Sequence, residues 1–171
     1  VSGIRINSLR FDAAGVVSTV SVDSGETLTL RSGGILVTSN VGSGSASITG
    51  GILDTTGNEL FVHQNNVASP FTIGSSIIGA TAVTKSGLGT LQLNGVNTYT
   101  GQTSINEGTI VLGGGNAIGD GSLVAIKSDS SAVLDLNNSS ETVAGLSTFG
   151  GLSTTGFAGG TVAIGSGTLI L

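Results

Sequence analysis

The side chains that could do chemistry in this sequence are few. His63 is the single histidine, so a Ser-His-Asp triad would have to use it. A glycan-cleaving site would need several carboxylates, with cations, on one outer face. The candidates are Arg5, Arg10, Arg31, Asp12, Asp23 and Asp54. Arg10 and Asp12 are two residues apart and would share one face of a strand, which a solvated pair explains equally well. No carboxylate pair recurs at a fixed spacing, so we predict no catalytic residue and no enzyme.

Motifs for metals and nucleotides are similarly isolated. Residues 113–121 resemble a Gly-Asp calcium nonapeptide, but the motif occurs once and lacks a regular phase, so we interpret it as a corner loop. Gly-x-Gly at 87–89 and at 119–121 precedes strand-like rather than helical segments, which disfavours a phosphate cradle. Residues 137–140 contain glycosylation sequons, which matter only in a eukaryotic secretory host. We therefore predict no metal ligand and no cofactor-binding residue.

Composition excludes several functional classes. The chain has 171 residues with 30 Gly, no Cys and no Met, and its net charge is −5 with only five Lys and Arg. So few cations leave no basic stripe for nucleic acid, and no disulfide or thiolate site is possible. Mean hydropathy is +0.43, yet no apolar run is long enough for a transmembrane helix. Because the chain starts at Val1 and lacks Met, we expect it to be a processed or excised piece.

Hydrophobic periodicity predicts an all-β fold. Short runs alternate apolar and polar residues, as strands with one buried face do, and Gly-rich clusters that suit sharp corners separate them. Helix is disfavoured because Gly, Thr, Val and Ile are abundant. The runs lie at 20–23, 27–30, 59–63, 90–93, 109–112, 133–136, 161–164 and 168–171.

The spacing of similar strands separates two all-β architectures. Leu93 and Leu112 are 19 positions apart, and Leu112 and Leu136 are 24 apart, so one strand type returns at about one coil of a parallel β-helix. A two-sheet sandwich, the alternative, would bury large aromatics, but aromatic residues are 4% here and Trp is absent. We predict a β-solenoid with irregular coils, in which residues 67–82 and 148–157 are long inserted loops.

A family resemblance is carried by residues 85–112, KSGLGTLQLNGVNTYTGQTSINEGTIVL. This segment resembles the autotransporter-associated β-strand repeat, also called the passenger-associated transport repeat, and the best-matching repeat spans 83–112. Segments 116–121, 132–137 and 166–171 are similar to further pieces of such repeats. The resemblance implies a right-handed parallel β-helix in a protein exported to the outer surface of a Gram-negative bacterium.

Side-chain alternation within this repeat predicts which residues face the core. Leu91, Leu93, Ile105, Ile110 and Leu112 should point inward, and Thr90, Gln92 and Thr109 outward. Corner residues Asn94, Asn97 and Asn106 should bond backbone or stack between coils, and Tyr99 should pack at a corner. In the earlier run, Leu60 and Val62 should face inward, with Phe61 and His63 outward.

Three functional hypotheses follow for residues 1–171, taken as a single β-solenoid segment. The first is a non-catalytic extracellular stalk or scaffold of a bacterial surface or secreted protein. The second is an adhesin or glycan-binding module, whose loops would bind surface glycans or neighbouring cell surfaces. The third is self-assembly into a filament or sheath through open ends. The apolar strand 167–171 has no cap, so we expect the natural molecule or its assembly to continue past Leu171.

Overall fold

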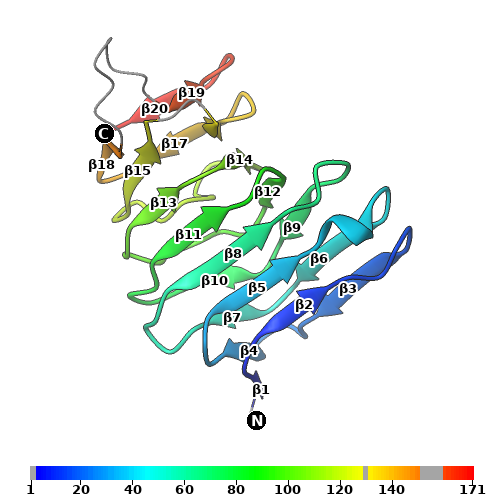
Figure 1. Ribbon diagram of the computed structural model, residues 1–171. Helices are drawn as coiled ribbons and strands as arrows, with labels where there is room; N and C mark the ends of the chain where they lie inside the picture. Colours follow the sequence, from blue (N-terminus) through cyan, green and yellow to red (C-terminus); the bar gives the residue numbers. More distant parts are fainter. Residues whose placement is uncertain (1–2, 129–130, 151–159) are drawn as a thin grey trace.

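Parallel strands stacked coil upon coil make up the protein (Figure 1). The computed structural model describes residues 3–128, 131–150 and 160–171. These residues form a β-solenoid of about six turns. Within them there is one 3-10 turn, η1 (Ser39–Val41), and no α-helix. The predicted all-β parallel β-helix is confirmed, and the sandwich alternative is wrong, because strands pair in parallel with the equivalent strand of the next coil.

Each coil runs along three faces of the solenoid. The second face is one seven-stranded sheet: β2 (Leu9–Phe11), β5 (Gly34–Val37), β8 (Leu60–Gln64), β11 (Val83–Ser86), β13 (Thr103–Ile105), β15 (Leu123–Lys127) and β18 (Gly145–Phe149). The third face is another seven-stranded sheet: β3 (Val17–Ser21), β6 (Ser45–Thr49), β9 (Phe71–Ile73), β12 (Thr90–Leu93), β14 (Gly108–Leu112), β16 (Ala132–Asp135) and β19 (Thr161–Ala163).

The first face is divided into two shorter sheets. One sheet contains β1 (Ile4–Ile6), β4 (Thr27–Leu30), β7 (Ile52–Asp54) and β10 (Ser76–Ile77). The other contains β17 (Ser140–Thr142) and β20 (Thr168–Ile170). Between β10 and β17 the chain passes twice along this face without forming a strand.

Strand register confirms the predicted coil lengths. Leu93 pairs with Leu112, 19 positions later, and Val111 pairs with Asp135, 24 positions later. The longest steps on this face are 28 positions: one joins Val20 to Ile48, and the other joins Val133 to Thr161. Coils of unequal length can stack because the strands keep their register while the corners absorb the extra residues.

The core is a narrow column of aliphatic side chains. All five residues predicted to face inward are fully buried: Leu91, Leu93, Ile105, Ile110 and Leu112. The residues predicted to face outward, Thr90, Gln92 and Thr109, are partly exposed. Each buried Leu or Ile contributes about 1.5–3 kcal/mol relative to an exposed one. The alternation in the repeat therefore specifies the core of these coils directly.

The prediction of an inserted loop at 67–82 is wrong. This segment contains β9 and β10, which pair with β6 and β7 as ordinary parts of a coil. Both strands are only two or three residues long, and Gly and Pro surround them, so their alternation is too short to recognise in the sequence. Of the second predicted loop, 148–157, residues 148–149 end β18, while residues 151–157 lie outside the described residues.

Side-chain hydrogen bonds join the coils where the first face has no strand, beside backbone bonds such as that from the Thr98 N–H to the Ile77 carbonyl at 3.0 Å. The Asn97 side chain accepts a hydrogen bond from the Ile77 N–H at 2.8 Å and donates one to the Ala117 carbonyl at 2.5 Å, thereby joining three successive coils. The buried Glu141 carboxyl accepts the N–H groups of Ala117 and Ile118, at 3.2 and 3.0 Å. Burial raises the pKa of Glu141, and these N–H groups oppose the rise. The predicted backbone-bonding role is thus confirmed for Asn97.

We expect Asn97→Ala to lower the free energy of unfolding by about 2 kcal/mol, because it leaves the buried Ile77 N–H and Ala117 carbonyl without these partners. Urea unfolding followed by circular dichroism would measure the change. Asn94→Ala is the matched control, since Asn94 is an exposed corner residue of the same repeat. Equal losses in the two variants would contradict the bridging role.

Candidate functional site

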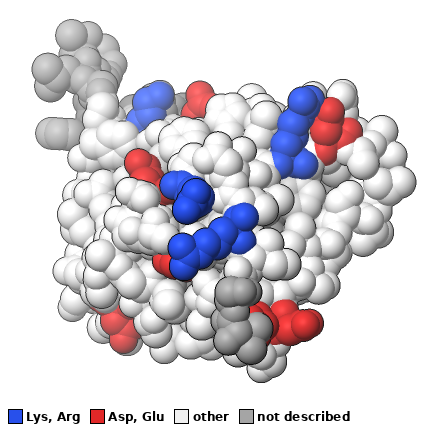
Figure 2. Space-filling model, turned by 90° about the horizontal axis from the view of Figure 1, so that it is seen from below, with Lys and Arg blue, Asp and Glu red and all other residues white. Residues whose placement is uncertain are grey.

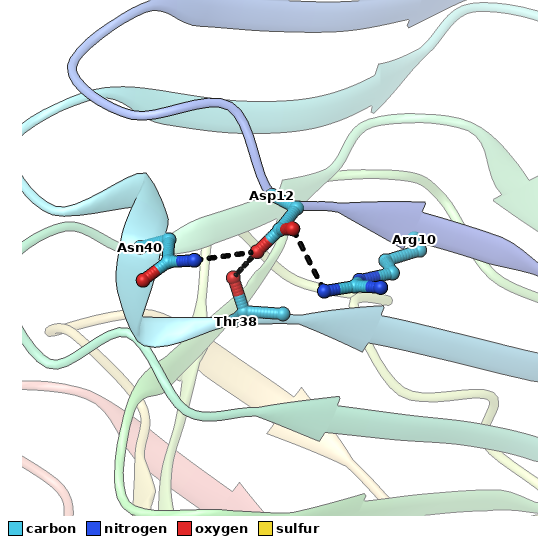
Figure 3. A network of polar contacts seen from close by, with 4 residues as sticks. All are labelled: Arg10, Asp12, Thr38 and Asn40. Atoms are coloured by element: carbon cyan, nitrogen blue, oxygen red, sulfur yellow. Dashed lines mark hydrogen bonds and ion pairs between the residues drawn. The ribbon is translucent and has the colours of Figure 1, made fainter.

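The Arg10 and Asp12 side chains form a surface network at one edge of the second face (Figure 3). Arg10 Nη2 lies 2.7 Å from Asp12 Oδ2, and Thr38 and Asn40 donate to the other carboxylate oxygen. The Thr38 hydrogen bond lowers the pKa of Asp12; burial opposes this shift, and Arg10 and Asn40 add to the lowering. The predicted shared face is confirmed. The carboxylate ties the end of β2 to the η1 turn of the next coil.

The remaining acid–base candidates from the sequence are not brought together. Arg5 and Asp54 are two strands apart on the first face. Thr29, on the strand between them, pairs with Arg5 on one side and with Asp54 on the other. The Asp54 carboxylate accepts the Thr56 N–H at 2.9 Å in its own turn. Asp23 lies at a corner after β3, where it lines a cavity of about 230 Å³ near the β1 end of the solenoid. The arrangement therefore assembles no cluster of these groups around His63.

His63 lies on the outer surface of the second face, as predicted. Leu60 and Val62 on the same strand are fully buried, while Phe61 is 39% exposed. The Phe61 and His63 rings are nearly parallel, at 8°, and their centroids lie 6.4 Å apart. These two rings form an aromatic pair on β8, the third strand from the β2 edge of the sheet.

A continuous row of outward side chains crosses the second face through His63. Strand register aligns one residue from each coil: Arg10, Leu36, His63, Ser86, Asn106, Lys127 and Phe149. A parallel row contains Phe61 between smaller residues, namely Gly34, Thr84, Ser104, Ala125 and Ser147. The large and small rows together make a trough that runs along the solenoid axis.

Two open depressions occupy this trough and share Phe61 and His63. One, of about 410 Å³, extends toward Arg10 and Leu36. The other, of about 400 Å³, extends in the opposite direction toward Phe149 and is also lined by Ser86, Asn106, Glu107 and Lys127. We call the pair of depressions the outer groove. It combines aromatic, polar and charged side chains in one concavity.

Charged side chains are sparse and scattered where the solenoid is viewed along its axis from the β1 end (Figure 2). Within the described residues, no three His, Asp or Glu side chains are placed to hold a metal ion. Nor does the described part of the chain include any helix long and apolar enough to span a membrane. The calcium-like segment 113–121 lies between β14 and β15, as expected for a corner.

Lys85 is a buried cation that the sequence reading did not single out. Its side chain is fully buried, and its ammonium donates to the carbonyls of Ser86, Gly87 and Glu107 at 3.0, 2.6 and 3.1 Å. Burial lowers the pKa of Lys85 to about 8, and the Glu107 charge opposes part of this shift. Alternation within the strand indicates this burial, because Lys85 is two positions after the inward-facing Val83.

Tyr99 packs at a corner, as predicted. It is fully buried, and its hydroxyl lies 2.7 Å from Thr103 Oγ1, which lies 2.8 Å from Ser122 Oγ of the next coil. Burial raises the pKa of the Tyr99 phenol above its ordinary range. The hydroxyl chain satisfies polar groups inside the core and leaves Tyr99 no open surface for a ligand.

Comparisons with known proteins agree with this architecture. Residues 83–112 match the family described as Passenger-associated-transport-repeat, and the match starts with β11 and ends with β14. The chain is similar to the Adhesin BmaC autotransporter of Brucella suis biovar 1 (strain 1330), with 34% identity over 110 residues. That alignment covers 64% of this chain but only 3% of the adhesin, so the chain spans a small part of that relative's length. No solved structure matches the chain.

Proposed function

We propose that this chain, which carries an autotransporter passenger repeat, is a non-catalytic structural segment of an extracellular protein at the surface of a Gram-negative bacterium. The observation that carries the proposal is the continuous stacking of seven strands on each of two faces. Every coil bonds mainly to its two neighbours, so the solenoid resists bending and opening along its length. Seven stacked strands extend about 29 Å, which suits a stalk or scaffold.

Limited proteolysis of the whole chain under native conditions tests the structural role. Because each strand of residues 83–112 pairs with strands of the adjoining coils, we expect this segment to stay intact while exposed corners are cut. Mass spectrometry of the products would locate the cuts, and the urea-unfolded chain serves as the digestible control. Rapid native cleavage inside 83–112 would rule out a rigid stalk.

A second candidate function is adhesion, and the outer groove is the observation that favours it. The Phe61 and Phe149 rings that line the groove are each 39% exposed and lie outside the buried core. The protein that is 34% identical to this chain over 110 residues is named an adhesin. In this proposal the contact surface is the sheet face, rather than the loops expected from the sequence.

Assembly of separate chains into a filament remains a prediction. Stacking occurs between the coils of one chain, and the terminal strands β3 and β19 lie at opposite ends of the third face. Analytical ultracentrifugation over a wide concentration range would test whether whole chains associate. A concentration-independent monomer would contradict filament formation.

A further inference from the structure

We propose that the outer groove binds a neutral, linear polysaccharide that lies along the solenoid axis; this ligand assignment rests on the adhesive function proposed above. The groove crosses all seven strands of the second face, from Arg10 on β2 to Phe149 on β18. Six strand spacings give it a length of about 29 Å. Each coil presents one outward side chain to the groove, and the strand spacing is close to the length of one sugar ring in an extended glycan.

Phe61 supplies the stacking surface at the centre of the groove. The C–H groups on one face of a pyranose ring pack against an aromatic ring in the way that other apolar groups do. Gly34 and Thr84 are the neighbours of Phe61 in adjacent strands, both have smaller side chains than Phe61, and the Phe61 ring is 39% exposed. Phe149 supplies a second exposed ring at one end.

Polar side chains between the two aromatic rings match the hydroxyl groups of a sugar. Ser86 and Asn106 are adjacent in the row, with Asn106 Nδ2 3.2 Å from Ser86 Oγ. A hydroxyl and an amide each offer both donors and acceptors, and the imidazole of His63 adds another polar group. Sugar hydroxyls also donate and accept, so the coils that present His63, Ser86 and Asn106 could each hydrogen-bond to a sugar ring.

The charges of the groove favour a neutral ligand. Arg10 is paired with Asp12 at 2.7 Å, and the other depression is lined by one cation and one anion, Lys127 and Glu107. The opposite charges offset one another along the groove, so neither a polyanion nor a polycation gains from long-range attraction. A folded protein partner is disfavoured because large apolar side chains are sparse along the groove. They are Leu9, Leu36, Phe61 and Phe149, together with the buried Ile35.

Titration calorimetry of the whole chain tests the ligand class. The ligands are linear cello-, xylo- and laminari-oligosaccharides of about six rings, a length that fills the groove. We expect at least one series to bind, and Phe61→Ala to weaken that binding roughly tenfold through lost stacking. A tenfold rise in salt should change the Kd by less than about twofold. Val111→Ala is the matched control, because Val111 is an outward residue on the third face, and it should bind normally.

Folding of each variant is checked by its urea midpoint, and His63→Ala replaces Phe61→Ala if the latter is unstable. Binding to none of the three series, or binding to polygalacturonate alone, would overturn the ligand assignment. Equal loss of glycan binding in Phe61→Ala and Val111→Ala would overturn the groove as the site.

Attachment of beads coated with the chain to cells is measured in parallel. Attachment that needs Phe61 without any glycan binding would refute the ligand class and retain adhesion, whereas attachment independent of Phe61 would refute adhesion through this groove.

Discussion

Replacing Gly33 with alanine is expected to lower the free energy of unfolding by about 3–5 kcal/mol, a large effect for one methyl group. Gly33 has a φ of +67°, and a Cβ there would lie 1.7 Å from the Glu59 carbonyl oxygen of the next coil. The obstacle is backbone that is itself held in place, since the Gly33 carbonyl accepts the Phe61 N–H at 2.8 Å. The coils would have to separate locally to admit the methyl group.

Gly57→Ala is the matched control for Gly33→Ala. Gly57 also has a positive φ, +79°, but nothing lies within 4 Å of its added Cβ. Gly57→Ala should lower the free energy of unfolding only by the cost of placing alanine in the left-handed conformation, about 1 kcal/mol. Urea unfolding of both variants would separate coil contact from backbone conformation. A difference below about 1 kcal/mol between them would refute close coil approach as the reason for glycine at position 33.

The second large effect is a stability maximum near pH 10. The pKa of Lys85 is lowered by burial to about 8 from 10.5. Between these values the unfolded chain holds a proton that the folded chain has released, so stability rises with pH. The rise from pH 8 to pH 10 should be about 2 kcal/mol. Above pH 10 stability should fall, because the buried Tyr99 phenol, whose pKa is raised, keeps its proton while the unfolded chain loses it.

Urea unfolding at a series of pH values would measure this profile. Lys85→Met keeps a long side chain but removes the titrating group, so the rise between pH 8 and pH 10 should disappear. Lys127→Met is the control, since Lys127 lies on the outer surface, and it should retain the rise. Tyr99→Phe should weaken the fall above pH 10. A profile of Lys85→Met that rises as steeply as the parent chain would show that another group is responsible.

Much of the structure of the repeat at 83–112 could be predicted from the sequence. Its inward residues, such as Leu91 and Ile110, and the pairing of Leu93 with Leu112 could be predicted, because strict alternation and a recurring Thr-Leu pattern are local signals. The short strands β9 and β10 could not be predicted, because two or three residues carry too little alternation to indicate a strand. Lys85 was overlooked because a charged residue is expected outside unless its partners are known.

The candidate site was predicted only in part. The outward orientation of Phe61 and His63 followed from alternation within one strand. That Phe149 and Arg10 lie in the same trough depends on the register of seven strands from seven coils of unequal length. Neither composition nor spacing in the sequence indicates which outward residues align, so the sequence pointed to loops instead.

The sequence by itself determined that the chain is all-β, because each run of alternating residues must bury one face. The return of similar strands after 19 and 24 positions favoured a parallel β-solenoid over a sandwich. The sequence also determined the family resemblance at 83–112. Only the tertiary structure decided which side chains meet between coils: the Asn97 bridge where the first face has no strand, the Lys85 ammonium that reaches the Glu107 carbonyl, and the outer groove. The contacts that Asn97 makes with Ile77 and Ala117, and that Lys85 makes with Glu107, join residues 20 to 22 positions apart. Their geometry depends on how many residues each corner absorbs, which local propensity does not encode.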